Sequence, residues 1–235
     1  MPISHAFSRL STYYRRHGFR ASVKRAWLFV RRSFSSSKMV VFYWDLTSHS
    51  KSAANDSLPD HLTIERKSSR EEIDASDWSQ IVDFWNRELT EPLFSLRLKQ
   101  GATIWLLRSE GKLAGYVWGA IEHTPEPYYY PLAAGDAYLY DSLVFPEYRG
   151  RRFHLYLLNY VMTEMKAQNM RRAHFDVAEW NQASLSSTVK TAYPRHVLGV
   201  ARKATFFGRT FVEWLPSQQL DSEAVRVEAK KVSAA

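Results

Sequence analysis

The residues that could do chemistry are concentrated in one stretch, Asp141–His154 (DSLVFPEYRGRRFH). A β-rich run ends at Val144, and Pro146 prevents it from continuing. The turn that follows is basic and contains Arg149, Arg151 and Arg152. A helical pattern follows the turn, and the unpaired N–H groups and positive dipole end of a helix start can hold a phosphate or pyrophosphate. A plain strand–turn–helix with a solvated basic turn has the same pattern, so both interpretations stand at this point.

The elements that must position this stretch alternate between strands and helices. The Glu110–Gly111 turn between two apolar runs predicts a hairpin. We expect strands at 39–46, 61–66, 102–108, 113–121, 137–144, 172–178, 197–201 and 205–214. We expect helices at 77–87, 93–99, 151–167 and 181–191. Strand-helix alternation after an antiparallel start predicts an α+β fold with a mixed α/β sheet.

The positive charge of the chain is confined to its N-terminal segment. Residues 1–38 hold nine Lys or Arg and no Asp or Glu, whereas the rest holds 23 basic and 24 acidic residues. Apolar side chains in this segment recur at helical spacing, namely Phe19, Val23, Ala26, Trp27, Val30 and Phe34. Such a helix can lie on an anionic membrane surface or pack on its own domain, and periodicity does not distinguish the two. Nucleic acid is the less favoured partner, because no nucleic-acid module surrounds the basic residues.

Composition divides the chain and excludes several classes of protein. We expect a basic helical leader with a strand at 1–46 and a polar linker at 47–60. The folded domain that contains the candidate phosphate-binding stretch follows at 61–216, with a polar tail at 217–235. The absence of cysteine excludes disulfides and thiolate chemistry. The eight histidines form no metal-binding spacing, and we expect no metal. No apolar run is long enough to span a bilayer, so we expect a cytoplasmic protein that can lie at the inner face of the membrane.

Two segments together resemble the GNAT acetyltransferases. Val144–Gly150 (VFPEYRG) resembles their acyl-CoA-binding motif, in which a strand, a proline and an Arg-Gly pair precede a helix. Asn181–Ser184 with Val189–Tyr193 resembles the second signature of the superfamily. The resemblance covers about residues 60–215 and implies a mostly antiparallel sheet flanked by helices, with two strands splayed at the cofactor site.

The resemblance implies acetyl-CoA or another acyl-CoA as cofactor. The implied binding residues are Leu143, Val144, Arg149, Gly150, Arg151, Arg152, Phe153, His154, Asn181 and Ser184. Backbone N–H groups near Leu143–Val144 would hold the pantetheine and the developing oxyanion. Asn181 could instead be a simple helix cap.

The same resemblance implies direct acyl transfer to an amine or hydroxyl of a small molecule or sugar, such as a cell-envelope sugar or lipid-linked precursor. A general base must then accept a proton, and the candidates are Asp141 first and Glu122 second. Asp141 could equally be satisfied by a nearby arginine. Trp118, Tyr138 and Tyr140 are candidates for the acceptor pocket, although aromatic residues on strands are more often core.

The sequence departs from the GNAT pattern at three positions. Arg152 and His154 stand where the motif has small residues that let the backbone approach phosphates, and Thr188 stands where a tyrosine general acid often lies. Bulky side chains there either crowd the phosphates or point aside. The alternative to an enzyme is therefore a non-catalytic GNAT-fold module that docks on a membrane or protein partner through its basic leader.

Overall fold

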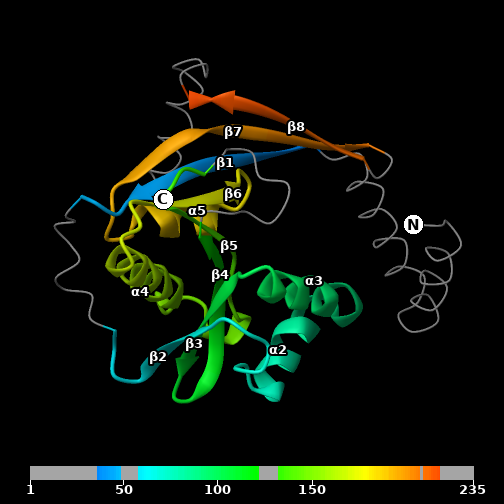
Figure 1. Cartoon of the computed structure of the whole chain (residues 1–235), viewed down its shortest axis with the longest axis vertical. Helices are drawn as coiled ribbons and strands as arrows, with labels where there is room; N and C mark the ends of the chain where they lie inside the picture. Colours follow the sequence, from blue (N-terminus) through cyan, green and yellow to red (C-terminus); the bar gives the residue numbers. More distant parts are fainter. Residues whose placement is uncertain (1–35, 49–57, 122–131, 207–208, 218–235) are drawn as a thin grey trace, which may run out of the picture.

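The computed structural model describes residues 36–48, 58–121, 132–206 and 209–217. One eight-stranded sheet runs through these residues in the order β2-β3-β4-β5-β6-β1-β7-β8 (Figure 1). Neighbouring strands are antiparallel except for β5 and β6, which are parallel. The predicted fold class, a mostly antiparallel mixed sheet flanked by helices, is confirmed.

The element bounds follow the predicted periodicities closely. The strands are β1 (Ser36–Asp45), β2 (Leu62–Lys67), β3 (Thr103–Ser109), β4 (Lys112–Ile121), β5 (Asp136–Val144), β6 (Arg172–Ala178), β7 (Arg195–Phe206) and β8 (Arg209–Pro216). The helices are α2 (Ala75–Trp85), α3 (Arg87–Lys99), α4 (Phe153–Ala167) and α5 (Gln182–Val189), with a 3-10 turn, η2, at Pro146–Tyr148. The largest difference is in α3, which begins six residues before the predicted start at Leu93 and contains Pro92 in its interior.

The first strand is part of the sheet, which corrects the predicted boundary at residue 46. β1 pairs with β6 along Met39–Asp45 and with β7 along Ser36–Trp44. Val40, Phe42 and Trp44 are buried in the same core cluster as β6 and α4. Residues 36–46 therefore belong to the folded domain. The predicted leader helix, residues 49–57 of the linker and the tail beyond Ser217 lie outside the described residues.

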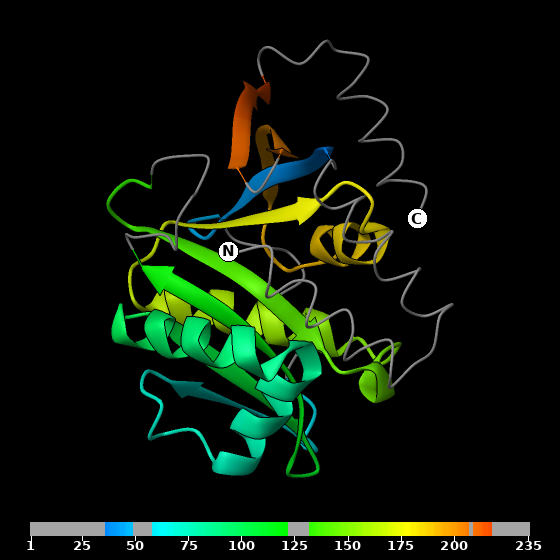
Figure 2. The ribbon, with the colours of Figure 1, turned by 90° about the vertical axis from the view of Figure 1, so that its right-hand side faces the viewer.

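Helices cover both faces of the sheet (Figures 1 and 2). On one face α4 packs with Phe153, Leu157, Leu158 and Val161 against the strands. On the other face α2 and α3 contribute Trp78, Ile81, Val82, Phe94 and Leu98 to a separate core cluster. A group bound between strands of this sheet would therefore meet α4 on one face and α2 and α3 on the other. In the described part of the chain, no helix is long and apolar enough to cross a membrane.

The parallel pair β5–β6 is short, and the two strands separate early. Their pairing covers only Asp136–Tyr138 with Arg172–His174, although both strands continue for several residues. A buried ion cluster lies at the paired end: Arg172 Nε is 2.7 Å from Asp136 Oδ1, and His174 Nε2 is 3.2 Å from Asp136 Oδ2. Burial lowers the pKa of His174 despite the neighbouring carboxylate, so its ring is neutral. This cluster holds the two strands together just before they part.

We expect Asp136→Asn to destabilise the fold strongly. The substitution keeps the shape of the side chain but removes the charge that Arg172 faces in a fully buried position, which costs about 2–4 kcal/mol. Urea unfolding followed by circular dichroism measures the loss. The matched control is Arg202→Gln, which removes the exposed pair with Glu213 and should change stability by less than about 0.5 kcal/mol. Equal effects of the two variants would contradict a structural role for Asp136.

Candidate active site

A β-bulge at Asp141 shapes the strand that borders the gap between β5 and β6. Tyr116 pairs with Leu143 and Trp118 with Tyr140, so Val117 of β4 faces the two residues Asp141 and Ser142. Asp141 has a φ of 46°, in the left-handed region that single bulge residues adopt. After the bulge, the alternation of β5 side chains between the two faces of the sheet is shifted by one residue.

The bulge leaves Val144 with backbone groups that face the gap. Phe145 N donates to Ala114 O at 3.0 Å, so the next pair, Val144 with Gly115, lies at a non-hydrogen-bonded position of the ladder. The N–H and C=O of Val144 therefore point away from β4, toward the side from which β6 has separated. Gly115 permits this close packing, because a Cβ there would lie 2.6 Å from Leu143 O. Of the two residues predicted to supply a backbone donor, only Val144 has the required direction, since Leu143 faces β4.

The α4 helix begins two residues later than predicted, at Phe153, and Arg152 is its N-cap with a φ of 62° and a ψ of 11°. Arg152 thus adopts the left-handed conformation that favours the glycine usual in this motif. Among the described residues, no acceptor is found for the backbone N–H groups of Gly150, Arg151, Phe153 and His154. Such donors, together with the positive end of the helix dipole, are the features on which the prediction of an anion site rests.

His154 does not crowd this anion site, because its side chain turns toward α5. Its Nδ1 lies 2.8 Å from Ser187 Oγ, which connects the first turn of α4 to α5. Burial lowers the pKa of His154 to about 4, so the ring is neutral near pH 7. The two bulky residues of the motif therefore leave the helix start open in different ways: Arg152 by its backbone conformation, and His154 by its direction.

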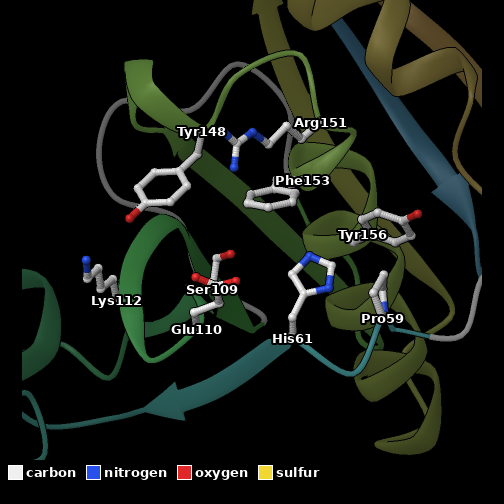
Figure 3. Close-up of a pocket in the computed structure, with 9 residues that line it drawn as sticks. All are labelled: Pro59, His61, Ser109, Glu110, Lys112, Tyr148, Arg151, Phe153 and Tyr156. Atoms are coloured by element: carbon white, nitrogen blue, oxygen red, sulfur yellow. The ribbon is translucent and has the colours of Figure 1, made fainter.

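Arg149 and Arg151 leave the turn in different directions. Arg149 Nε donates to Val144 O at 3.1 Å, so its guanidinium lies along the edge of β5 that faces the gap. Arg151 borders a pocket of about 590 Å³ between the start of α4 and the turn that joins β3 to β4 (Figure 3). The other residues that line this pocket are Pro59, His61, Ser109, Glu110, Lys112, Tyr148, Phe153 and Tyr156.

The second predicted signature, on α5, contributes mainly to structure. Asn181 is the N-cap of α5, and its Oδ1 accepts from Ser184 N at 3.2 Å, as in the simple capping alternative. Thr188 is fully buried: its hydroxyl donates to Leu185 O at 2.8 Å and accepts from Arg195 Nη1 at 3.0 Å. Thr188 is therefore committed to the core and does not take the place of the tyrosine acid.

The candidate base Asp141 lies on the α3 face of the sheet. Its Oδ2 is 2.7 Å from Arg97 Nη1, and its side chain remains 48% exposed whereas that of Arg97 is 11% exposed. The arginine that could satisfy Asp141 is thus Arg97, on α3. Sequence reasoning missed Arg97, and only its position one turn after the apolar Leu93 pointed to a residue between core and surface. The second candidate base, Glu122, lies outside the described residues.

The aromatic candidates for the acceptor pocket lie beside this ion pair but are core residues. Trp118 is fully buried, and Tyr138 and Tyr140 are 7% and 6% exposed. Burial raises the pKa of Tyr140 to about 12, so its hydroxyl remains protonated and can donate a hydrogen bond. The expectation that strand aromatics belong to the core is confirmed. The Arg97 guanidinium lies against the rings of Trp118 and Tyr140, whereas the Tyr138 hydroxyl donates to Asp176 on β6.

Comparison with known proteins identifies a family. A model of the acetyltransferase (GNAT) family matches residues 70–187, half of the chain. One similar structure is that of a fungal multi-domain GH3 β-N-acetylglucosaminidase with a GCN5-related glucosamine N-acetyltransferase region, with a TM-score of 0.51 and 14% identity, covering 77% of this chain and 22% of that one. Another is a GNAT acetyltransferase from Colwellia psychrerythraea, with a TM-score of 0.49 and 10% identity, covering 77% of this chain and 61% of that one. The chain spans less than two thirds of either relative. No curated protein matches the sequence significantly.

We expect His154 to make the fold less stable as the pH falls. The unfolded histidine takes up a proton near pH 6.5 and the folded one only near pH 4, so protonation favours the unfolded state between these values. Relative to His154→Gln, which can still bond Ser187, the wild type should lose about 1–3 kcal/mol of unfolding free energy between pH 7 and pH 4. Urea titrations of both proteins at several pH values measure the difference. A difference that does not change with pH would mean that the ring is solvated.

Proposed function

The chain belongs to the acetyltransferase (GNAT) family, and from this premise we propose that it transfers an acetyl or other short acyl group from acyl-CoA to an amine or hydroxyl acceptor. One observation carries the proposal. The gap between β5 and β6 presents the backbone groups of Val144 only a short turn away from the anion site at the start of α4. The backbone groups that would hold the thioester and the N–H groups that would hold the pyrophosphate are therefore separated in the chain by one short turn.

The residues present suit the acyl-CoA, although no ligand forms part of the structure. The pyrophosphate would accept from the N–H groups of Gly150, Arg151, Phe153 and His154, aided by the positive charge of the Arg149, Arg151 and Arg152 side chains. The pantetheine amides would pair with the free edge of Val144, where Arg149 now occupies the carbonyl oxygen. That interaction is exposed and can exchange for a ligand amide. Asn181 and Ser184 would border the far side of the gap through α5.

The chemistry required of the chain is orientation, oxyanion stabilisation and proton removal. The acceptor nitrogen or oxygen attacks the thioester carbonyl carbon, the C–S bond breaks, and the sulfur leaves as the thiol of CoA after taking up a proton. The Val144 N–H would stabilise the negative charge that develops on the carbonyl oxygen. Asp141 would accept the proton of the nucleophile, because its carboxylate is half exposed on the same strand.

A second candidate function is a non-catalytic module that keeps the fold and the anion site. It is favoured by Thr188, which is buried and bonded and leaves the usual position of the general acid without a proton donor. In that role the basic segment at 1–35 would dock on an anionic membrane or on a protein. Acyl-CoA binding without turnover on any acceptor would favour this function.

We expect acetyl-CoA to bind the full-length protein, and we expect Arg149→Ala/Arg151→Ala to weaken binding by about 10- to 100-fold, because two charges near the pyrophosphate are lost. Isothermal titration measures the dissociation constants. The two single variants show on which side of the α4 start the phosphates lie, since Arg149 faces the gap and Arg151 the pocket. The control, Arg202→Ala, removes an exposed arginine from β7 and should leave affinity unchanged. No saturable binding to the folded wild type would overturn the proposed function.

We expect Asp141→Asn to reduce turnover by about 100-fold or more while acetyl-CoA binds with nearly unchanged affinity. The amide keeps the size of the side chain but does not accept a proton. Release of CoA thiol, followed with a panel of amine and hydroxyl acceptors, measures turnover, and titration measures binding. Glu147→Gln is the control, because Glu147 is an exposed carboxylate on η2. Full activity of the Asp141 variant would assign the proton to another group.

A further inference from the structure

The α3 face of the gap contains polar atoms that are buried without partners. Among the described residues, Arg97 Nε, Trp118 Nε1 and the Tyr140 hydroxyl are covered from solvent and have no hydrogen-bond partner. The guanidinium of Arg97 lies 4.8 Å from the centre of the Tyr140 ring and 5.5 Å from that of Trp118, so the three groups form one cluster. A buried donor without an acceptor costs about 1–3 kcal/mol, and a cluster of them is typical of a ligand site.

The chemistry of these atoms selects the ligand. Arg97 Nε and Trp118 Nε1 are obligate donors, and the Tyr140 hydroxyl stays protonated, so each of the three calls for an acceptor rather than a donor. A carboxylate offers two oxygens with about four lone-pair positions and is the preferred partner of a guanidinium. The group that Arg97 pairs with in this structure, Asp141, is itself a carboxylate. Exchange of this carboxylate for one from a ligand keeps the charge of Arg97 neutralised.

The charge balance requires that the ligand also carry an ammonium group. A carboxylate ligand displaces Asp141 from Arg97 and leaves two negative charges for one positive charge. An ammonium group beside the ligand carboxylate restores neutrality and gives Asp141 a new partner. Because Arg97 and Asp141 are adjacent, the two ligand charges must be adjacent as well, as they are in an α-amino acid.

An apolar stripe continues from Arg97 along α3. Leu89 and Leu93 precede Arg97 by two turns and one turn, and residues four apart lie next to each other on one side of a helix. Leu89 and Leu93 are 50% and 46% exposed. These leucines give an apolar side chain a surface to contact while its polar end is held at Arg97.

We propose that the acceptor is an apolar α-amino acid whose carboxylate binds Arg97, Tyr140 and Trp118 and whose ammonium group faces Asp141. This inference rests on the proposed function and names its acceptor. When the ligand carboxylate replaces Asp141 at Arg97, Asp141 is free to take a proton from the ammonium group. The neutral amine then attacks the thioester, the C–S bond breaks, and the products are the N-acyl amino acid and the CoA thiol. Arg97 is thus a specificity-determining residue. It also keeps Asp141 paired until the ligand carboxylate replaces it, so that Asp141 can accept a proton only when the acceptor is bound.

The test compares acceptors that differ in one group. L-leucine, L-leucinamide and isoamylamine share a side chain, but only L-leucine has the carboxylate. With acetyl-CoA and the full-length protein, we expect kcat/KM for L-leucine to exceed that for L-leucinamide by about 10- to 100-fold, the value of one lost charge-assisted interaction. In Arg97→Gln this ratio should fall to about one. The ratio is taken within each variant, so any general effect of the substitution on Asp141 cancels.

Two further variants keep the test decisive if Arg97→Gln does not fold. Tyr140→Phe removes a single hydroxyl and should lower the L-leucine to L-leucinamide ratio by about 3- to 10-fold. Leu89→Ala/Leu93→Ala should lower the preference for L-leucine over glycine and leave the carboxylate preference unchanged. If L-leucinamide or isoamylamine is acetylated as well as L-leucine, the amino-acid inference is wrong and the acyltransferase function stands. If acetyl-CoA is bound but no amino acid is acetylated, the inference is also wrong. If titration detects no acetyl-CoA binding, the proposed function fails and the inference falls with it.

Discussion

The early separation of β5 from β6 is the constraint on which the rest of the site depends. A strand in the middle of a sheet normally has both edges paired, and unpaired backbone groups there are costly. Here β6 turns its other edge to β1, and β1 in turn pairs with β7, so the second half of the sheet is complete without β5. The buried contact between Asp136 and Arg172 fixes where pairing ends. Beyond that point the edge of β5 that faces β6 pairs with no strand among the described residues.

The two faces of this gap have different chemical character because different helices cover them. On the α4 side lie backbone N–H groups without an acceptor among the described residues, together with Arg149 and Arg151. On the α3 side, the bulge at Asp141 sets a carboxylate beside Arg97, among aromatic rings. The bulge also turns Leu143 and Phe145 onto the same face as Tyr140, which closes the core under α2 and α3. One backbone irregularity thus sets both the direction of the Val144 backbone groups and the place of the candidate base.

Local sequence patterns were sufficient for the elements of the sheet and for the turn that precedes α4. The alternation in β3 and β4 and the Pro146–Gly150 turn before α4 are local features, so they can be read without knowing which strands are neighbours. Three features could not be predicted without knowing which elements are neighbours in the folded chain. Val40, Phe42 and Trp44 predict a buried strand but do not say that it lies between β6 and β7. The pairing of Arg97 with Asp141 joins residues 44 positions apart.

The third feature is the direction of the two bulky residues in the phosphate-binding turn. Small residues in this motif serve two purposes: they permit a left-handed backbone, and they leave space at the helix start. This chain meets the two requirements in different ways. Arg152 takes up the left-handed backbone that glycine would adopt, at a cost of about 1 kcal/mol, and its side chain adds positive charge. His154 sends its ring to Ser187, where burial keeps it neutral, so the space above the helix start stays open. The departures from the motif therefore change the charge of the turn, while Arg152 keeps the backbone conformation of glycine and the His154 ring lies against α5.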